Sequence, residues 1–387
     1  MCGFLAVAKG LRLPSLWGAT QAQSSCAFGI VKRCLYGQIW RWLGVPVNHY
    51  VVFAALSFWL LAAFLITLIW YARRMRLTAS VEGAAVVALF ASSFALTYLT
   101  SLVGYLDFPM AMLAIAAVAS PPRWRLPAIS AAALFGILLH ELYFLVFLPV
   151  SLLSAILPAL RDATSTRDAL RRLAPSICVV LAAGALVVAL AWGRPMDAAS
   201  VAALKQQVTR SVDFPVDNFY FDEFFVAMCQ STLDNVRIMI GRASDPLYWV
   251  RQVLGALAFL PSVALAGWVA WKSAATAVPR AKLWLIAAVV TAAVLSPLLL
   301  NAFAWDLYRW QALVVLNAYV AMGVIAAQPH GLALATGDRR RFLFLAFLLM
   351  LANMATATEF MSSQPANMFP FDRLLAPSEP MANHAGP

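Results

Sequence analysis

Three short polar groups stand at the ends of long apolar runs, and their residue types suit acid–base and anion-binding chemistry. Asp107 lies in Gly-Tyr-Leu-Asp-Phe-Pro at 104–109, His140 and Glu141 interrupt the apolar stretch 126–160, and Asp306 precedes Arg309 by three residues. A carboxylate or a neutral imidazole can accept a proton from a hydroxyl group. An arginine can hold a phosphate with its planar fork of donors.

Each group also has a structural interpretation. An aspartate in a tight turn is often a helix cap, and Asp306 with Arg309 can be an ion pair on one helix face. The His140–Glu141 pair is harder to explain in this way, because short apolar segments flank it and leave it close to the membrane. Our candidate catalytic residues are Asp107, His140 and Glu141, and our candidate substrate-binding residues are Tyr105, Asp306, Arg309 and Trp310.

The composition places these groups in a membrane protein. Of the 387 residues, 63% are hydrophobic and 12% are charged, against roughly 25% charged in an ordinary globular protein. The net charge of +11 would suggest a nucleic-acid surface in a soluble chain, but the basic residues form short clusters between apolar runs. That arrangement is typical of membrane topology, so we expect the lipid bilayer as a partner and no nucleic acid.

The apolar runs predict an all-α, polytopic integral membrane protein with about ten transmembrane helices. Residues 126–160 are expected to cross twice, because one helix of that length would be far longer than the roughly 30 Å hydrocarbon core. The expected spans are 50–72, 81–104, 108–120, 126–139, 142–160, 175–193, 252–271, 283–303, 307–327 and 342–358.

Basic clusters in alternate loops orient the spans. They lie at 73–76, 123–125, 161–172, 272–282 and 339–341, which the positive-inside rule places in the cytoplasm. The three polar groups then face outward together. Residues 1–49 also fall outside although they carry five basic residues, which breaks the rule. We expect that an ordinary first span is absent and that residues 24–47 form an interfacial amphipathic segment with Tyr36, Trp40 and Trp42.

Three regions follow from this pattern. Residues 1–49 form a basic, interfacial N-terminal segment that takes the place of a first span, residues 50–358 form the transmembrane domain, and residues 359–387 form a polar tail containing prolines. Within the transmembrane domain, an external loop at 194–251 mixes aromatic and acidic residues, and 219–241 is expected to be one amphipathic helix.

Several classes of site lack their motifs. The sequence has no G-x-x-x-x-G-K-[ST] loop for ATP, no H-E-x-x-H zinc site and no G-x-S-x-G elbow. The five cysteines include no C-x-x-C pair and accompany only four histidines, so they support neither a disulfide framework nor a zinc module. No spacing demands a metal; a divalent ion is possible only if Asp107, Glu141 and Asp306 converge.

The three polar groups and their flanks resemble bacterial multispanning glycosyltransferases of the GT-C superfamily and the related polysaccharide polymerases of the O-antigen-polymerase type. The resemblance covers about 80–330 and is carried by three segments: Gly104 to Pro109, His140 to Pro149, and Asp306 to Trp310. It departs from the family in one respect, because the key acid of GT-C enzymes usually follows a first span that this chain lacks.

The resemblance implies a GT-C-like fold and a multi-pass protein of the bacterial inner (plasma) membrane with its site facing the periplasm. Such an enzyme takes a sugar from a polyprenyl-phosphate-linked donor and passes it to a glycan or lipid-linked acceptor, in envelope or exopolysaccharide synthesis, and requires no cofactor. Asp107 or Glu141 would be the base, and Arg309 with His140 would hold the phosphate.

Two other functions remain open on sequence grounds. A secondary transporter would use the same acids to carry protons or bind substrate, but its ionisable groups should lie near the membrane midplane. A non-catalytic membrane subunit of an envelope assembly would have no use for the His140–Glu141 pair.

Overall fold

The computed structural model describes residues 2–26, 33–191, 196–276, 278–304 and 306–355, and within these ranges the chain is helical, without strands. Six of the helical segments are long and apolar enough to cross a membrane, and a seventh is if the bent pair Val81–Ser92 and Phe94–Ser101 counts as one span. The prediction of an all-α, multi-pass membrane protein is confirmed at this level. The six are Tyr50–Arg74, Tyr143–Asp162, Thr166–Leu190, Pro246–Ala275, Arg280–Ala302 and Leu307–Ala326.

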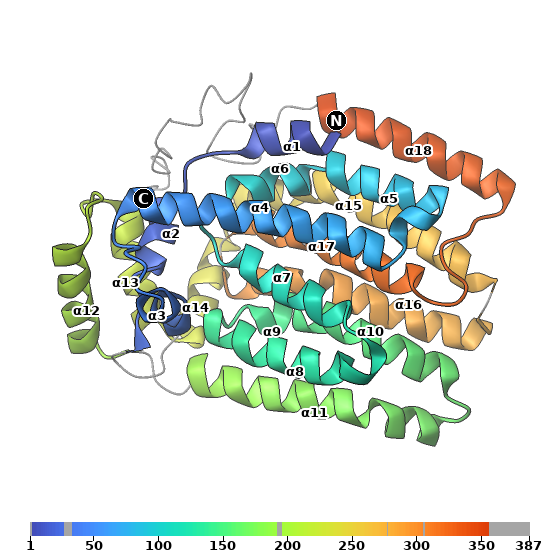
Figure 1. Ribbon diagram of the computed structural model, residues 1–387, viewed down its shortest axis with the longest axis horizontal. Coiled ribbons are helices and arrows are strands. Elements are labelled where there is room, and N and C mark those ends of the chain that lie inside the picture. The colour runs from blue at the N-terminus through green and yellow to red at the C-terminus, as the bar shows by residue number, and fades with distance from the viewer. Residues whose placement is uncertain (1, 27–32, 192–195, 277, 305, 356–387) are drawn as a thin grey trace.

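Every expected span falls on a helix of the bundle in Figure 1. The long helices are α4 (Tyr50–Arg74), α10 (Leu148–Asp162) with the short α9 (Tyr143–Val146) before it, α11 (Thr166–Ala191), α15 (Pro246–Ala275), α16 (Arg280–Leu295) extended by η3 (Ser296–Ala302), and α17 (Leu307–Ala326). The bent pair is α5 (Val81–Ser92) and α6 (Phe94–Ser101), which meet at 46° where Ser93 caps α6.

Four expected spans are not among the six: 81–104, which is the bent pair, and the three at 108–120, 126–139 and 342–358. Helix α7 (Asp107–Val118) has only 12 residues, whereas α8 (Pro122–Leu139) and α18 (Thr336–Ala355) begin with arginines that shorten their apolar length. The division of 126–160 into two helices is confirmed, because α8 ends at Leu139 and α9 begins at Tyr143.

Helix α17 forms the centre of the bundle, and its whole apolar length is buried. Two tyrosines join it to α4: the hydroxyl of Tyr71 donates to the carbonyl of Val320 (2.6 Å), and the hydroxyl of Tyr319 donates to that of Leu68 (2.9 Å). A helix without lipid contact can carry polar side chains if each finds a partner. Asn317 does so by donating to the carbonyl of Val146 (2.7 Å), next to the break between α9 and α10.

One end of the bundle, which we call the loop end, carries the elements outside the long helices (Figure 1). These are α2 (Leu16–Gln21), α3 (Cys34–Trp42), α12 (Ala198–Ser211), α13 (Phe219–Cys229) and α14 (Thr232–Arg242). Trp17 packs edge-on against Phe224, and Asp213 accepts hydrogen bonds from the N–H of Tyr50 and from His49. The expectation of one helix over 219–241 is wrong, since Gln230 is extended and a capping box at Ser231 starts α14.

The N-terminal segment packs into the bundle before it reaches the loop end. Helix α1 (Cys2–Gly10) lies against α5 and α6, close enough that a Cβ at Gly10 would collide with the carbonyl of Thr97. Arg12, which follows the end of α1, is also buried in the bundle and is only 8% exposed. Helix α3 exposes Trp42 and buries Tyr36, and the interfacial position of 24–47 stays a prediction. The polar tail at 359–387 lies outside the described residues.

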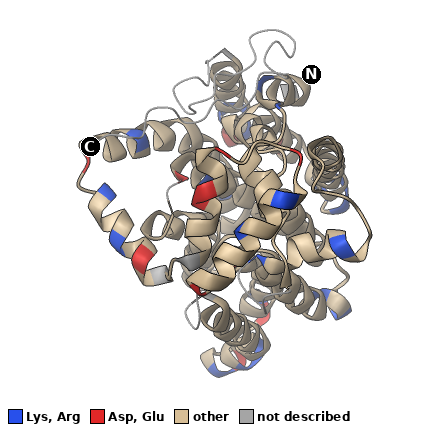
Figure 2. Cartoon of the chain, turned by 90° about the vertical axis from the view of Figure 1, so that its left-hand side faces the viewer, with Lys and Arg blue, Asp and Glu red and all other residues tan. Residues whose placement is uncertain are grey.

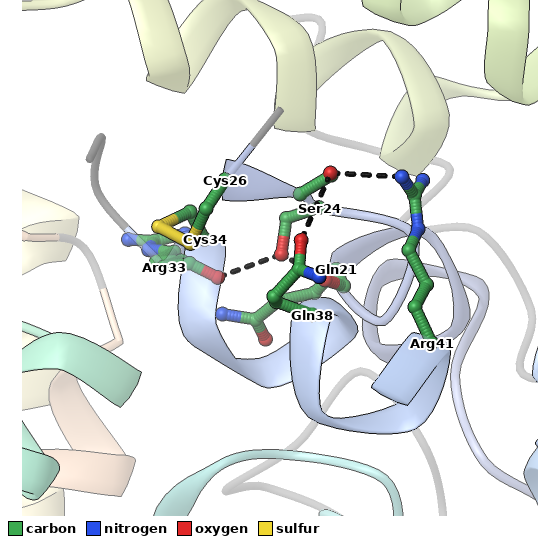
Figure 3. Close-up of a disulfide and its surroundings, with 8 residues drawn as sticks. Gln21, Ser24, Cys26, Arg33, Cys34, Gln38 and Arg41 are labelled. Carbon is green, nitrogen blue, oxygen red and sulfur yellow. Dashed lines mark hydrogen bonds between the residues drawn. A yellow bond between two sulfur atoms is a disulfide. The ribbon is translucent and has the colours of Figure 1, made fainter. Parts of the chain in front are cut away.

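The expectation that the cysteines form no disulfide is wrong, because Cys26 and Cys34 are bonded (Figure 3). Their Cα atoms lie 4.8 Å apart, within the range that a disulfide needs. A separation of eight residues carries no sequence signal, so only the tertiary structure reveals the pair.

The close approach of α17 and α4 predicts intolerance of any side chain at Gly323. A Cβ there would lie 2.5 Å from the Tyr71 ring, which its hydrogen bond holds in place. We expect Gly323→Ala to lower the free energy of unfolding by about 1–3 kcal/mol, measured by denaturation of the purified protein in detergent. The matched control is Gly267→Ala on α15, where a Cβ meets nothing within 4 Å. Equal stability of the two variants would contradict the packing.

Candidate functional site

A buried ion pair joins the first turns of α7 and α17 at the loop end. The Nε and Nη2 of Arg309 donate to the two carboxylate oxygens of Asp107 at 2.9 and 3.1 Å. The side chains of Arg309 and Asp107 are 6% and 2% exposed. This two-fold geometry is the strongest form of an arginine–carboxylate contact, and it joins residues 202 positions apart in the chain.

A second carboxylate and two aromatic rings complete the surroundings of Arg309. Its Nη1 donates to Asp306 at 3.0 Å, and the rings of Tyr105 and Trp310 each lie 5.0 Å from the guanidinium carbon. The structure therefore brings together five of the candidate residues.

Local backbone features place these side chains. Gly104 has a φ of +89°, a conformation that favours glycine, and a Cβ there would lie 2.8 Å from the Phe53 ring. The turn that follows presents Tyr105 and starts α7 at Asp107. Asp306 immediately precedes α17, and its carboxylate faces Arg309 one turn later instead of capping the helix.

The hydrogen bonds around Arg309 leave Asp107 poorly placed to accept a proton from a substrate. Both Asp107 oxygens accept from the guanidinium, and the guanidinium spends Nε, Nη1 and Nη2 on two carboxylates. The arrangement ties the first turn of α7 to that of α17 and carries one net negative charge. A proton-accepting role therefore suits the other carboxylate, Glu141, better.

His140 and Glu141 lie in the link between α8 and α9, and His140 is 2% exposed. Burial, the nearby charge of Arg33 and, more weakly, that of Arg309 lower the pKa of His140 to about 4, against the opposing effect of Glu141. The ring is therefore neutral near pH 7, and its Nδ1 lies 3.3 Å from the backbone nitrogen of Leu142. Glu141 approaches the same Nδ1 at 3.2 Å, a contact that becomes an ion pair only when the ring is protonated.

Arg33 is a member of this neighbourhood that the sequence did not single out. Its Nη2 lies 3.7 Å from Oε1 of Glu141, and the two side chains are 18% and 17% exposed. The available signal was indirect: Arg33 belongs to the external basic residues that break the positive-inside rule. Because Arg33 and Arg309 both affect His140, the two groups of charges are within electrostatic reach of each other.

The part of the chain that the structure describes offers no metal site. Among the described residues, no group of three or more histidine, cysteine, aspartate or glutamate side chains is placed to hold a metal ion. Asp107 turns both oxygens to Arg309, which removes it as a ligand in this arrangement.

No protein-family model, curated protein or solved structure matches the chain. The resemblance to GT-C glycosyltransferases therefore rests on the three sequence segments alone, and function has to be argued from the geometry of the loop end.

The Asp107–Arg309 pair predicts an asymmetric response to mutation. Arg309→Met leaves the buried Asp107 carboxylate without its partner and should cost about 3–5 kcal/mol of unfolding free energy in detergent. The double variant Asp107→Leu/Arg309→Met removes both charges and should be more stable than Arg309→Met alone. As a control, Asp306→Asn alters a 43% exposed carboxylate and should cost about 1 kcal/mol or less. A double variant no more stable than Arg309→Met alone would contradict the pairing.

The environment of His140 predicts an unusual titration. In ¹⁵N-histidine NMR spectra, assigned with His140→Gln, the ring should titrate near pH 4 instead of 6.5. Because the positive charge of Arg33 disfavours protonation, Arg33→Ala should move the midpoint upward, toward 6.5. A midpoint near 6.5 in the unmodified chain would show that the ring is hydrated and not buried beside Arg33.

Proposed function

We propose that the chain is a membrane glycosyltransferase or polysaccharide polymerase of GT-C-like architecture. It takes a sugar from a polyprenyl-phosphate-linked donor at the external face of a bacterial inner membrane and transfers it to a glycan or lipid-linked acceptor. One observation carries this proposal. Ionisable residues from distant parts of the chain gather, largely buried, at one end of an apolar helical bundle.

The position of these groups favours an enzyme over a transporter. They lie at helix ends, where α7, α9 and α17 begin and α8 ends, which is the depth of a lipid phosphate in one leaflet. A transporter needs its charges near the midplane and reachable from both sides. Figure 2 views the bundle from the loop end and shows basic and acidic residues mixed with one another there.

Two independent observations favour an external loop end. Basic residues gather at the opposite helix ends, where α4 stops at Arg74, α8 starts near Arg123 and α18 starts near Arg339, as expected of the cytoplasmic side. The Cys26–Cys34 disulfide belongs to the loop end, and disulfides form and persist in oxidising compartments such as the bacterial periplasm.

The chemistry assigned to the site is a displacement at the sugar carbon that carries the phosphate. Glu141, whose side chain is partly exposed, takes the proton of the acceptor hydroxyl as the new glycosidic bond forms and the lipid phosphate leaves. The Asp107–Arg309–Asp306 group positions the helix ends and holds Tyr105 where its ring can flank the sugar or the first isoprene units, whereas Trp310 is buried in the bundle. The neutral His140 offers a ring N–H as a donor.

Transfer by purified protein in liposomes tests the proposal. With a panel of radiolabelled sugars on polyprenyl phosphate and polyprenyl diphosphate, the unmodified chain should transfer at least one sugar to an acceptor. Glu141→Gln should lower that rate by about 100-fold or more, because a general base is lost. Asp168→Asn at an exposed ion pair of α11 should leave the rate unchanged. A Glu141→Gln variant that is folded and fully active would overturn the assignment of the base.

A further inference from the structure

Arg33 and Arg309, the two arginines beside the candidate site, differ in how many of their donors are used. Arg309 directs Nε, Nη1 and Nη2 to two carboxylates. In Arg33, by contrast, the buried Nε–H donates to none of the described residues, and Nη2 stands 3.7 Å from Glu141, beyond hydrogen-bond distance. A buried charged donor left without an acceptor is unfavourable, so this guanidinium is prepared for a further anion.

Two contacts hold the backbone at Arg33. Arg33 precedes Cys34, the half of the disulfide that opens α3, and its carbonyl accepts a hydrogen bond from the hydroxyl of Ser24 (2.6 Å) (Figure 3). Its φ of +61° is in the left-handed region, which arginine rarely adopts unless the surrounding structure enforces it. The disulfide and the Ser24 contact supply that enforcement.

Other cations at the loop end are less suited to a buried anion. Lys205 is paired with Asp222, Arg237 lies near Asp234, and both basic side chains are largely exposed to solvent. Arg41 donates to the hydroxyl of Ser25 and to the carbonyl of Gln23, which ties α3 to the turn before it.

We propose that Arg33 is the anion-binding residue of this site, that its ligand is the phosphate group of a phosphorylated lipid, and that the Cys26–Cys34 disulfide holds the guanidinium beside Glu141. The identity of the ligand as a lipid phosphate rests on the proposed function. Arg33 then takes the role that sequence reasoning assigned to Arg309. Its planar fork matches phosphate oxygens, and its place beside Glu141 sets the phosphate next to the base.

Binding measurements on the full-length protein in detergent test this without any sugar transfer. The probes are farnesyl phosphate, farnesol and inorganic phosphate. Isothermal titration calorimetry measures the binding of each. Farnesyl phosphate should bind at least about tenfold more tightly than either of the other two. Arg33→Ala should weaken farnesyl phosphate binding by about tenfold or more, and Arg33→Lys, which keeps the charge without the fork, should lose less. The control Arg210→Ala removes an exposed arginine of the same end and should have no effect.

Reduction of the disulfide provides a second test of the proposal. Dithiothreitol, or the change Cys26→Ser with Cys34→Ser, should weaken farnesyl phosphate binding in the unmodified chain but add nothing to Arg33→Ala. Unchanged binding in Arg33→Ala of normal thermal stability would overturn the proposal. Equal binding of inorganic and farnesyl phosphate would exclude a lipid ligand, and equal binding of farnesol would exclude anion recognition. A chain that binds as expected but transfers no sugar would refute the proposed function alone.

Discussion

The contact between Arg309 and its two carboxylates is the constraint on which the rest of the bundle depends. A guanidinium at the start of a fully buried helix would be prohibitively unfavourable without anionic partners. Asp107 and Asp306 supply them, and the Asp107 contact fixes where α7 begins relative to α17. Helix α7 has only 12 residues and packs against α4, α8 and α10, and the ion pair ties its first turn to the central helix.

From that point α17 serves as the axis around which the long helices pack. A backbone carbonyl of α17 accepts a hydrogen bond from the hydroxyl of Tyr71 on α4, and the hydroxyl of Tyr319 on α17 donates to a carbonyl of α4. Asn317 of α17 donates to a carbonyl next to the link between α9 and α10. Each of these bonds joins a side chain to a backbone carbonyl, so polar groups in the apolar interior find partners without adding buried charge. The same helix begins at the charged loop end, which couples packing of the bundle to the geometry of the candidate site.

The N-terminal segment resolves a conflict between charge and topology. Its basic residues would belong in the cytoplasm if they only set orientation, yet the structure gives them partners. Lys9 donates to the carbonyl of Met354, Arg41 to Ser25, and Arg33 faces Glu141. Positive charges that are engaged in contacts of this kind act as structural and site residues, so their number on one side need not obey the positive-inside rule.

Local sequence determined the helical class, the positions of the spans and the three polar groups, because apolar run length and helix-breaking residues act over short distances. It also marked Asp306 and Arg309 as one-turn neighbours. Only the tertiary structure decided that Arg309 takes Asp107 as its main partner, that Cys26 bonds Cys34, and that Arg33 stands at Glu141. These outcomes depend on which helix ends meet in space, and hydropathy and spacing along the chain contain no information about pairs of residues 108 or 202 positions apart.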